Sequence, residues 1–131
     1  MAEITPREAL FAFLSTDNTV MATVKNIHSR RVPLGAYKPL VVIYPTISDV
    51  PTRDLSGIAY RQARLQVTVM ADTQKEAETT IRAIIKAVDG FSGSMFGLFV
   101  IQALAETDRQ IDEDEVDEVH QHLDVIIKYE E

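Results

Sequence analysis

Residues 64–70 alternate between apolar and polar side chains, and they are the clearest strand signal in the chain. Leu65, Val67 and Val69 fall on one face, and polar residues separate them. A period of two with β-branched residues is typical of a strand that buries one face and exposes the other. The chain therefore has at least one strand whose apolar face needs a partner.

A helical stripe of apolar residues follows this strand. Thr73 and Glu76 have the spacing of a capping box, in which both side chains bond to free amides at a helix start. Gly90 suits the left-handed end of the same helix. Five apolar residues between these signals recur at helical spacing: Ala77, Ile81, Ile84, Ile85 and Val88. Because strand and helix are adjacent in sequence, we expect one long amphipathic helix packed on one face of the sheet.

The remaining apolar runs predict a small, mainly antiparallel sheet. Residues 40–44 form a continuous apolar run typical of a central strand, residues 95–104 alternate, and residues 119–129 form a final alternating strand. Residues 27–32 have weaker strand character. Strands that follow one another without a helix favour antiparallel pairing. We therefore predict an α+β fold with a sheet of about four to five strands.

Two short helices are predicted before the first strand. Thr5 precedes Pro6, and this pair is typical of a helix cap followed by the first helical residue. Asp17 is the expected cap of a second short helix that continues through Val24. Both helices carry small apolar stripes that can cover one edge of the core.

Two polar segments interrupt the predicted elements. Residues 49–60 are a long connection of mixed polarity, and loops of this length inside a compact domain often have a function. Residues 106–118 hold eight acidic residues and one arginine. Such a charge density disfavours packing, so we expect an exposed acidic loop there.

The composition is that of an ordinary globular domain, and we expect a single domain over residues 1–131. Hydrophobic residues make up 46% of the chain and charged residues 25%, which argues against disorder. The chain has no cysteine, which excludes disulfides and thiolate chemistry. No apolar run reaches the roughly 20 residues of a membrane span, and the N-terminus lacks a secretory pattern, so we expect a cytosol-like compartment.

Charge is distributed unevenly along the chain. The net charge is −7, and residues 101–131 contain eleven acidic and two basic residues. Residues 1–100 contain eleven basic and nine acidic residues, a slight positive excess. An acidic chain is a poor candidate for free nucleic-acid binding, because phosphate neutralisation needs clustered basic residues. The asymmetry allows the acidic end of one copy to meet a basic surface of another.

Candidate metal ligands occur in two places, and neither has the spacing that a metal site needs. His120, His122 and Asp124 alternate on one predicted strand, but alternate side chains project in parallel about 7 Å apart and do not converge on one ion. We interpret them as a solvated strand face. The acidic run also lacks the register of a calcium-binding loop. Its central members are Asp112, Glu113, Asp114 and Glu115.

Catalytic and phosphate-binding motifs are missing from the sequence, which contains neither G-x-S-x-G nor G-K-[ST]. We therefore expect no catalytic residue, no cofactor and no metal. A possible basic surface remains, and it has two interpretations: a solvated face, or a self-association surface, since arginine is enriched at interfaces. Its members are Arg30, Arg31, Arg53, Arg61 and Arg64.

The order of these signals resembles the tail completion (tail terminator, tail-to-head joining) proteins of long-tailed bacteriophages. The likeness covers the whole chain. It is carried by an ALFAFLS helix at residues 9–15, the PLVVIY run at residues 39–44 and the block of residues 53–90. That block is the strongest part, and it joins an RDLSG loop to the ARLQVTVMA strand and to the helix that ends at Gly90.

The resemblance implies a structural protein with no enzymatic activity, which assembles as a ring, commonly a hexamer, at the end of the tail tube. Such a ring ends tube growth and joins the tail to the head connector. The implied partners are further copies of the chain, the major tail tube protein and the head–tail connector protein. DNA would pass through without specific binding, and no membrane is involved. The expected location is the head–tail interface of the virion, and the host cytoplasm during assembly.

Two groups of residues follow as candidate contacts. We expect Arg53, Asp54 and Leu55, together with the other four arginines named above, to contribute to self-association or to tube contacts. We expect the acidic loop from Asp112 to Glu115 to face the passage through which DNA moves, where like charges prevent sticking.

Two other classes of function remain open. A small enzyme or ligand-binding α+β domain would need a pocket that joins His28, His120 or His122 to a carboxylate. A cytosolic interaction module would instead form a two-fold dimer that buries the sheet face.

Overall fold

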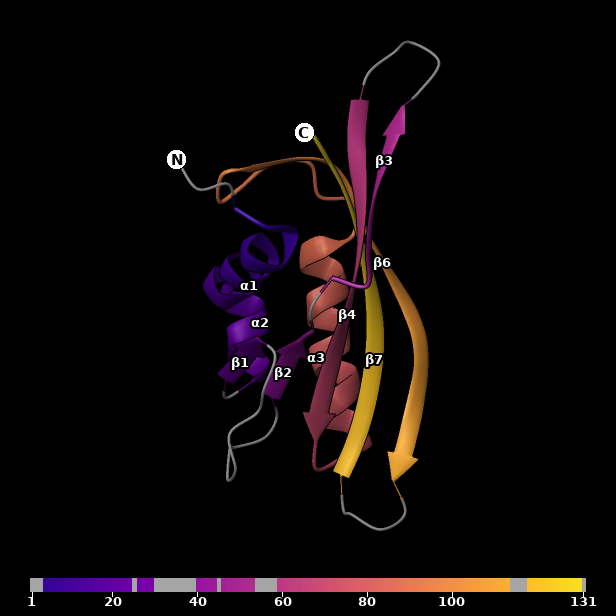
Figure 1. Ribbon diagram of the computed structural model, residues 1–131. Helices are drawn as coiled ribbons and strands as arrows, with labels where there is room; N and C mark the ends of the chain where they lie inside the picture. Colours follow the sequence, from indigo (N-terminus) through magenta and orange to yellow (C-terminus); the bar gives the residue numbers. More distant parts are fainter. Residues whose placement is uncertain are drawn as a thin grey trace.

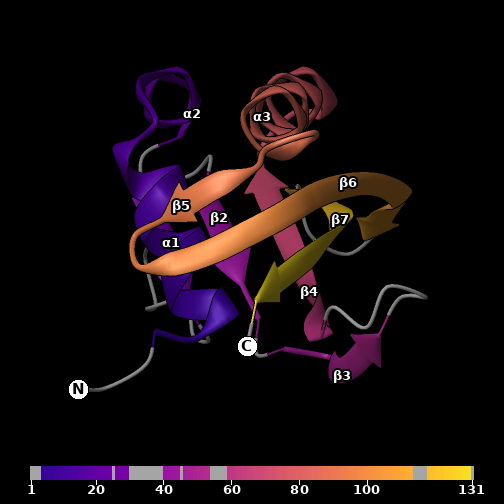
Figure 2. The same cartoon turned by 90° about the horizontal axis from the view of Figure 1, so that it is seen from above.

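A computed structural model describes residues 4–24, 26–29, 40–44, 46–53, 59–113 and 118–130 of the chain. The fold is α+β. One curled sheet carries the helices on one side, and two long hairpins extend from the sheet in opposite directions (Figures 1 and 2). The hydrophobic core lies between the helices and the sheet.

The sheet contains seven strands in the order β1-β2-β4-β7-β6-β5, and β3 also pairs with β4. β7 pairs along nearly the whole of one edge of β4. β2 and β3 pair with the other edge of β4, one after the other along its length. The pairing is antiparallel except between β1 and β2, which are parallel. The strands are β1 (Asn26–Ser29), β2 (Leu40–Ile43), β3 (Ser48–Arg53), β4 (Ala59–Ala71), β5 (Gly93–Met95), β6 (Leu98–Glu113) and β7 (Glu118–Glu130).

The sheet is larger than the predicted four to five strands, and part of the reason lies in residues 49–60. These residues were expected to form a loop, and that prediction is wrong for most of them. Residues 48–53 form strand β3, and β4 begins at Ala59. The segment has few apolar residues and contains Pro51, which lacks a backbone donor and is tolerated on an edge strand such as β3. Pairing with β4 compensates for this weak local preference.

The acidic segment also differs from its prediction as an exposed loop. Strand β6 continues through residues 106–113 and pairs with β7 as far as Glu113, opposite Glu118. Hydrogen bonding to a neighbouring strand therefore outweighs the local repulsion between acidic residues. A register shift between Thr107 and Arg109 interrupts the ladder, and such bulges bend a strand and increase its twist. Residues 114–117 lie outside the described residues.

The three helices begin where the sequence predicted caps. α1 (Pro6–Thr16) is capped by Thr5, whose side chain accepts a hydrogen bond from the amide of Glu8 at 3.2 Å. α2 (Asn18–Thr23) is capped in the same way by Asp17, at 3.0 Å from the amide of Val20. α3 (Gln74–Val88) is capped by Thr73, and Gly90 beyond its end has a φ of +83°. These local predictions are confirmed.

The core is built from the odd-numbered face of β4 and the inward faces of the helices. Leu65, Val67 and Val69 have no exposed surface, and neither does Ile84 of α3. α3 contacts β4, β6, β7 and α2. Burying one such aliphatic side chain stabilises the fold by about 1.5–3 kcal/mol. The polar face of β4 lies on the other side of the sheet, which no helix covers within the described residues.

Candidate assembly surfaces

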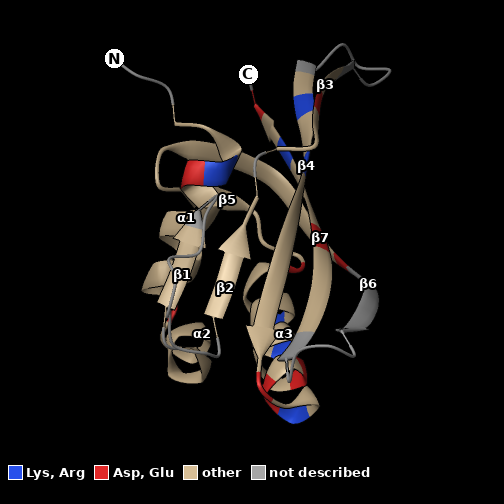
Figure 3. Cartoon of the chain, turned by 60° about the horizontal axis from the view of Figure 1, so that its bottom comes forward, with Lys and Arg blue, Asp and Glu red and all other residues tan. Residues whose placement is uncertain are grey.

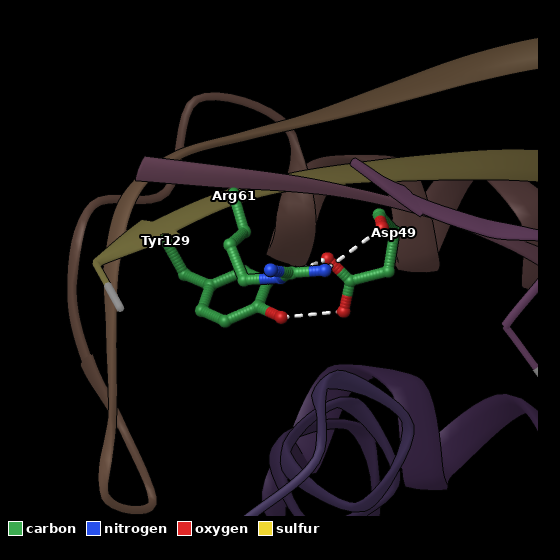
Figure 4. A network of polar contacts seen from close by, with 3 residues as sticks. All are labelled: Asp49, Arg61 and Tyr129. Atoms are coloured by element: carbon green, nitrogen blue, oxygen red, sulfur yellow. Dashed lines mark hydrogen bonds and ion pairs between the residues drawn. The ribbon is translucent and has the colours of Figure 1, made fainter. Parts of the chain in front are cut away.

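Three side chains from three different strands form a polar network at one end of the sheet (Figure 4). Arg61 of β4 donates from Nε to Asp49 Oδ1 at 2.8 Å, and from its terminal nitrogen to the backbone oxygen of Asp49 at 3.0 Å. The hydroxyl of Tyr129 on β7 donates to the other carboxylate oxygen of Asp49 at 2.5 Å. The network joins β3 to β4 and, across β4, to β7.

The environment of Tyr129 favours its protonated form. Burial of the ring, which leaves 8% of the residue exposed, raises the pKa of Tyr129 to about 12, and the hydrogen bond to Asp49 adds to the increase. The phenol therefore remains a donor at every physiological pH. Arg61, which the sequence suggested as a contact residue, already binds a carboxylate of its own chain.

A second ion pair lies on the face of the sheet opposite the core helices. Arg64 of β4 donates to Asp124 Oδ2 of β7 at 2.7 Å, and its guanidinium lies 3.9 Å from Glu106 of β6. The Arg64 side chain is 37% exposed, the Asp124 side chain 20%. The pair therefore crosslinks the central strands and leaves part of the guanidinium accessible to a partner.

His122 of β7 is paired with side chains of the neighbouring strand. His122 Nδ1 lies 2.8 Å from Thr68 Oγ1 and 3.0 Å from Gln66 Nε2, both on β4. Asp124, the third member of the predicted row, binds Arg64 as described above. No group of three potential metal ligands occurs within the described residues. The interpretation of this row as a solvated face holds only in part, because β4 supplies polar partners to His122 and Asp124, and all three residues are partly exposed.

The other predicted contact residues are only partly covered by the structure. Arg53 ends β3 opposite Ala59, and Asp112 and Glu113 lie in the last paired part of β6. Their roles in assembly remain predictions. Four of the residues proposed for self-association or tube contacts lie outside the described residues: Arg30, Arg31, Asp54 and Leu55. The same is true of Asp114 and Glu115 in the acidic run.

Charged positions are not spread evenly over the sheet. At the upper end of the sheet in Figure 3, basic and acidic positions lie close together, while β1 and β2 contain no Lys, Arg, Asp or Glu. This end of the sheet also holds the Asp49 network.

None of the helices in the described part of the chain has the length and hydrophobicity that a membrane span requires.

Exposed large apolar side chains occur at two places in the described sheet. Ile47, just before β3, and Val50, within it, are 56% and 52% exposed. We define the β5–β6 patch as Phe96, Phe99 and Ile101, which are 51%, 53% and 37% exposed. These five are the exposed large hydrophobic residues among those that the structure describes.

A shallow groove of about 460 Å³ adjoins the β5–β6 patch. Tyr60, Phe99 and Ile101 line it with apolar surface, and Glu130 adds a carboxylate. The groove does not contain His28, His120 or His122. This groove is therefore not the pocket joining a histidine to a carboxylate that a small enzyme would need.

The sequence did not predict the Asp49 network or the exposed apolar residues of β3 and β6. Asp49 was assigned to a loop, and its partner Tyr129 lies 80 residues away. The signal for the β5–β6 patch was present: Val100 is buried between Phe99 and Ile101, so the strand is apolar on both faces. A strand with one solvated face does not need apolar residues on that face.

Comparison with known proteins identifies relatives of the chain. Residues 8–130 match the family model described as Tail completion protein gp17. No curated protein sequence matches the chain.

A solved structure shares the fold. It comes from the virion of a native gene transfer agent (GTA) particle and aligns with a TM-score of 0.79 and 16% sequence identity. The alignment covers 96% of this chain and 95% of that one. At this identity the likeness establishes a common fold, and it extends over nearly the full length of both chains.

Proposed function

The chain belongs to the Tail completion protein gp17 family, and from this premise we propose that it caps the tail tube and joins the tail to the head connector. The family is one of phage tail structural proteins. The family match over residues 8–130 is the observation that carries the proposal. Capping means that the protein occupies the last ring position of the tube and stops the addition of further tube subunits.

The proposed working form is a closed ring, a hexamer. A ring is built from heterologous contacts, in which one surface of each copy meets a different surface of the next. The exposed apolar residues Phe99 and Ile101 beside the groove on β6 give one surface that such a contact can use. The proposed partners are further copies of the chain, the major tail tube protein and the head–tail connector protein.

We propose roles in assembly for the two groups of contact residues that were inferred from the sequence. Arg53 ends β3, and Asp54 and Leu55 follow it in the sequence between β3 and β4. We propose that these three residues contact the tube or the next copy. Asp112 and Glu113 end β6, and Asp114 and Glu115 follow them in the sequence before β7. We propose that they face the channel, where negative charge keeps DNA from binding. The protein would assemble in the host cytoplasm and remain at the head–tail interface.

Native mass spectrometry and electron microscopy test the ring. We expect the purified chain, incubated with tail tubes built from the cognate tube protein, to appear as a closed oligomer at one tube end. Tubes act as a template, so monomers in dilute solution do not contradict the proposal. A chain that stays monomeric at high concentration and leaves tube ends bare would contradict it. A stable two-fold dimer that buries the sheet face would favour the alternative, a cytosolic interaction or ligand-binding domain.

A further inference from the structure

One edge of strand β6 is covered only along its first half. β7 occupies the other edge over nearly the whole strand. On the first edge, β5 pairs with residues 98–100. The segment between α3 and β5 extends this coverage. Gly90 donates to the backbone oxygen of Ala103 at 2.8 Å, and the carboxylate of Asp89 accepts from the amide of Ala105 at 3.1 Å. Hydrogen bonding to this edge therefore continues as far as Ala105.

Beyond Ala105, no strand pairs with this edge within the described part of the chain. We define the open edge as this side of β6 over residues 106–113, which Figure 1 shows in orange at the outside of the sheet. An unpaired edge presents backbone donors and acceptors that can pair with any extended chain. A second copy of this protein carries an identical open edge, so edge-to-edge pairing between copies is a hazard for this fold.

The charged residues of β6 begin where the coverage of its edge ends. None of residues 98–105 is charged, whereas five of the eight residues 106–113 are: Glu106, Asp108, Arg109, Asp112 and Glu113. The register shift between Thr107 and Arg109 falls in the same half of the strand. Charged side chains and bulges are two of the devices by which natural sheets block pairing at an edge. Both occur on the part of β6 that needs them.

The other edges of the sheet are protected in different ways. β1 and β5 are only four and three residues long. β3 contains Pro51, which has no backbone donor. Short strands and proline also limit edge pairing. The open edge of β6 spans eight residues without a proline, so its charges and its bulge are the devices left to protect it.

The acidic residues of the open edge lower the stability of the pairing between β6 and β7. Glu113 stands opposite Glu118, and Glu106 stands opposite Asp124. Like charges directly opposite each other destabilise a strand pair. Arg64 relieves one of these two repulsions, since it lies 3.9 Å from Glu106 and 2.7 Å from Asp124. Contacts within the subunit therefore do not account for this choice of residues.

We propose that the charges on the open edge keep copies of the chain from joining sheet to sheet. In an antiparallel pairing of two open edges, Glu106 of one copy would stand near Glu113 of the other. The repulsion between such like charges opposes the backbone hydrogen bonds that would form. This inference goes beyond the proposed function and does not depend on it. It concerns the free chain before it meets a tail tube, and it implies that contacts between copies leave the open edge unpaired.

An uncharged-edge variant tests this role in solution, without tail tubes. It combines Glu106→Gln, Asp108→Asn, Arg109→Gln, Asp112→Asn and Glu113→Gln. Because it loses four acids and one base, its net charge is −4 where that of the parent is −7. We expect sedimentation velocity to show self-association at a protein concentration at least tenfold lower than for the parent chain. Amide hydrogen exchange in residues 106–113 should slow as the variant associates, because new strand pairing protects these amides.

Two further variants separate the charge of the edge from the charge of the whole chain. The control Asp72→Asn/Glu76→Gln/Glu78→Gln also has a net charge of −4, but its open edge is unchanged. It should associate no more than the parent. Adding Gln110→Lys to the uncharged-edge variant restores one charge, of opposite sign, to β6. We expect this addition to reverse the association, because lysine protects an edge as a carboxylate does.

Equal association of the uncharged-edge variant and the parent would overturn the proposal. Equal association of the control and the uncharged-edge variant would also overturn it, because net charge would then be responsible. The same holds if Gln110→Lys reverses nothing. Circular dichroism checks the fold, and an unfolded uncharged-edge variant would contradict the proposal by showing that the charges serve folding. None of these results depends on rings or capped tubes, so the proposed function can fail while this inference holds.

Discussion

Asp49 accepts a hydrogen bond from Tyr129 at 2.5 Å, and the two residues lie 80 positions apart in the sequence. The contact connects edge strand β3 with β7, which pairs with the opposite edge of β4. It holds the base of the β3–β4 hairpin against the sheet.

The hydrogen bond makes stability depend on pH in the alkaline range. The pKa of Tyr129 is about 12 in the folded chain and about 10 when unfolded. A raised pKa contributes stability that is complete below pH 10 and is lost as pH rises toward 12. We expect the free energy of unfolding to fall by about 2 kcal/mol over this range.

Tyr129→Phe is the matched variant for this prediction. At pH 8 it should be less stable than the parent by about 1 kcal/mol, because Asp49 loses a donor. The difference should shrink and change sign as the pH approaches 12. Urea unfolding followed by circular dichroism measures both curves. Parallel curves from pH 9 to pH 12 would show that Tyr129 does not titrate as described.

Arg64 and Asp124 should contribute modestly to stability, since the guanidinium is more than a third exposed. Solvent screening reduces the value of such a pair, and a double-mutant cycle with Arg64→Ala and Asp124→Ala should give a coupling of about 1 kcal/mol or less. The sequence also suggested Arg64 as an assembly contact. Ring formation by Arg64→Ala decides between these roles, because a purely internal pair leaves assembly intact.

Ile84 of α3 should be among the residues most sensitive to truncation. It has no exposed surface and packs within the core between α3 and the sheet. We expect Ile84→Ala to lower the free energy of unfolding by about 2–5 kcal/mol, because it removes buried methyl groups and leaves a cavity. Lys86→Ala, on an exposed position of the same helix, should change it by less than about 0.5 kcal/mol. Equal effects would argue against this packing of α3.

Deletion of residues 54–58 should leave the fold intact and weaken tail completion. Loop closure changes slowly with length, so the cost to stability is about 1 kcal/mol or less. Chemical denaturation measures stability, and the fraction of capped tubes in electron micrographs measures function. Normal capping by the deletion variant would show that the tip has no contact role. Leu55→Ser is a milder variant that tests the apolar part of the contact.

Neutralising the acidic hairpin should affect DNA passage and leave folding unchanged. The variant combines Asp112→Asn, Glu113→Gln, Asp114→Asn and Glu115→Gln. Removing like charges from β6 relieves repulsion, so we expect stability to be equal or slightly higher. We expect slower DNA release through assembled tails, since negative charge in the channel prevents sticking. Unchanged release with normal assembly would remove the channel role of these residues.

Local signals predicted the helix starts well because each cap depends on residues three positions apart. Thr5, Asp17 and Thr73 all accept the expected amide hydrogen bonds. The strand at residues 64–70 was equally clear, because apolar and polar residues alternate within one segment. Both kinds of signal come from residues close together in the sequence, so they can be recognised without knowledge of the tertiary structure.

Strand β3 and the acidic part of β6 could not be predicted in this way. Each has a weak local preference for a strand, and each forms because a long neighbouring strand supplies hydrogen bonds. The Asp49 network likewise depends on a partner distant in sequence. Of the suggested contact residues, Arg61 and Arg64 proved to pair inside the chain, which composition alone does not reveal.

We propose that this chain acts by occupying the end of a growing tube, and tube length tests this role most directly. Tail tubes are polymerised from the cognate tube protein with and without the purified chain, and their lengths are measured by electron microscopy. We predict long, variable tubes without the chain, and tubes that stop growing and carry a cap at one end when it is added. Tubes that keep the same length distribution and the same bare ends at saturating concentrations of the chain would contradict the account.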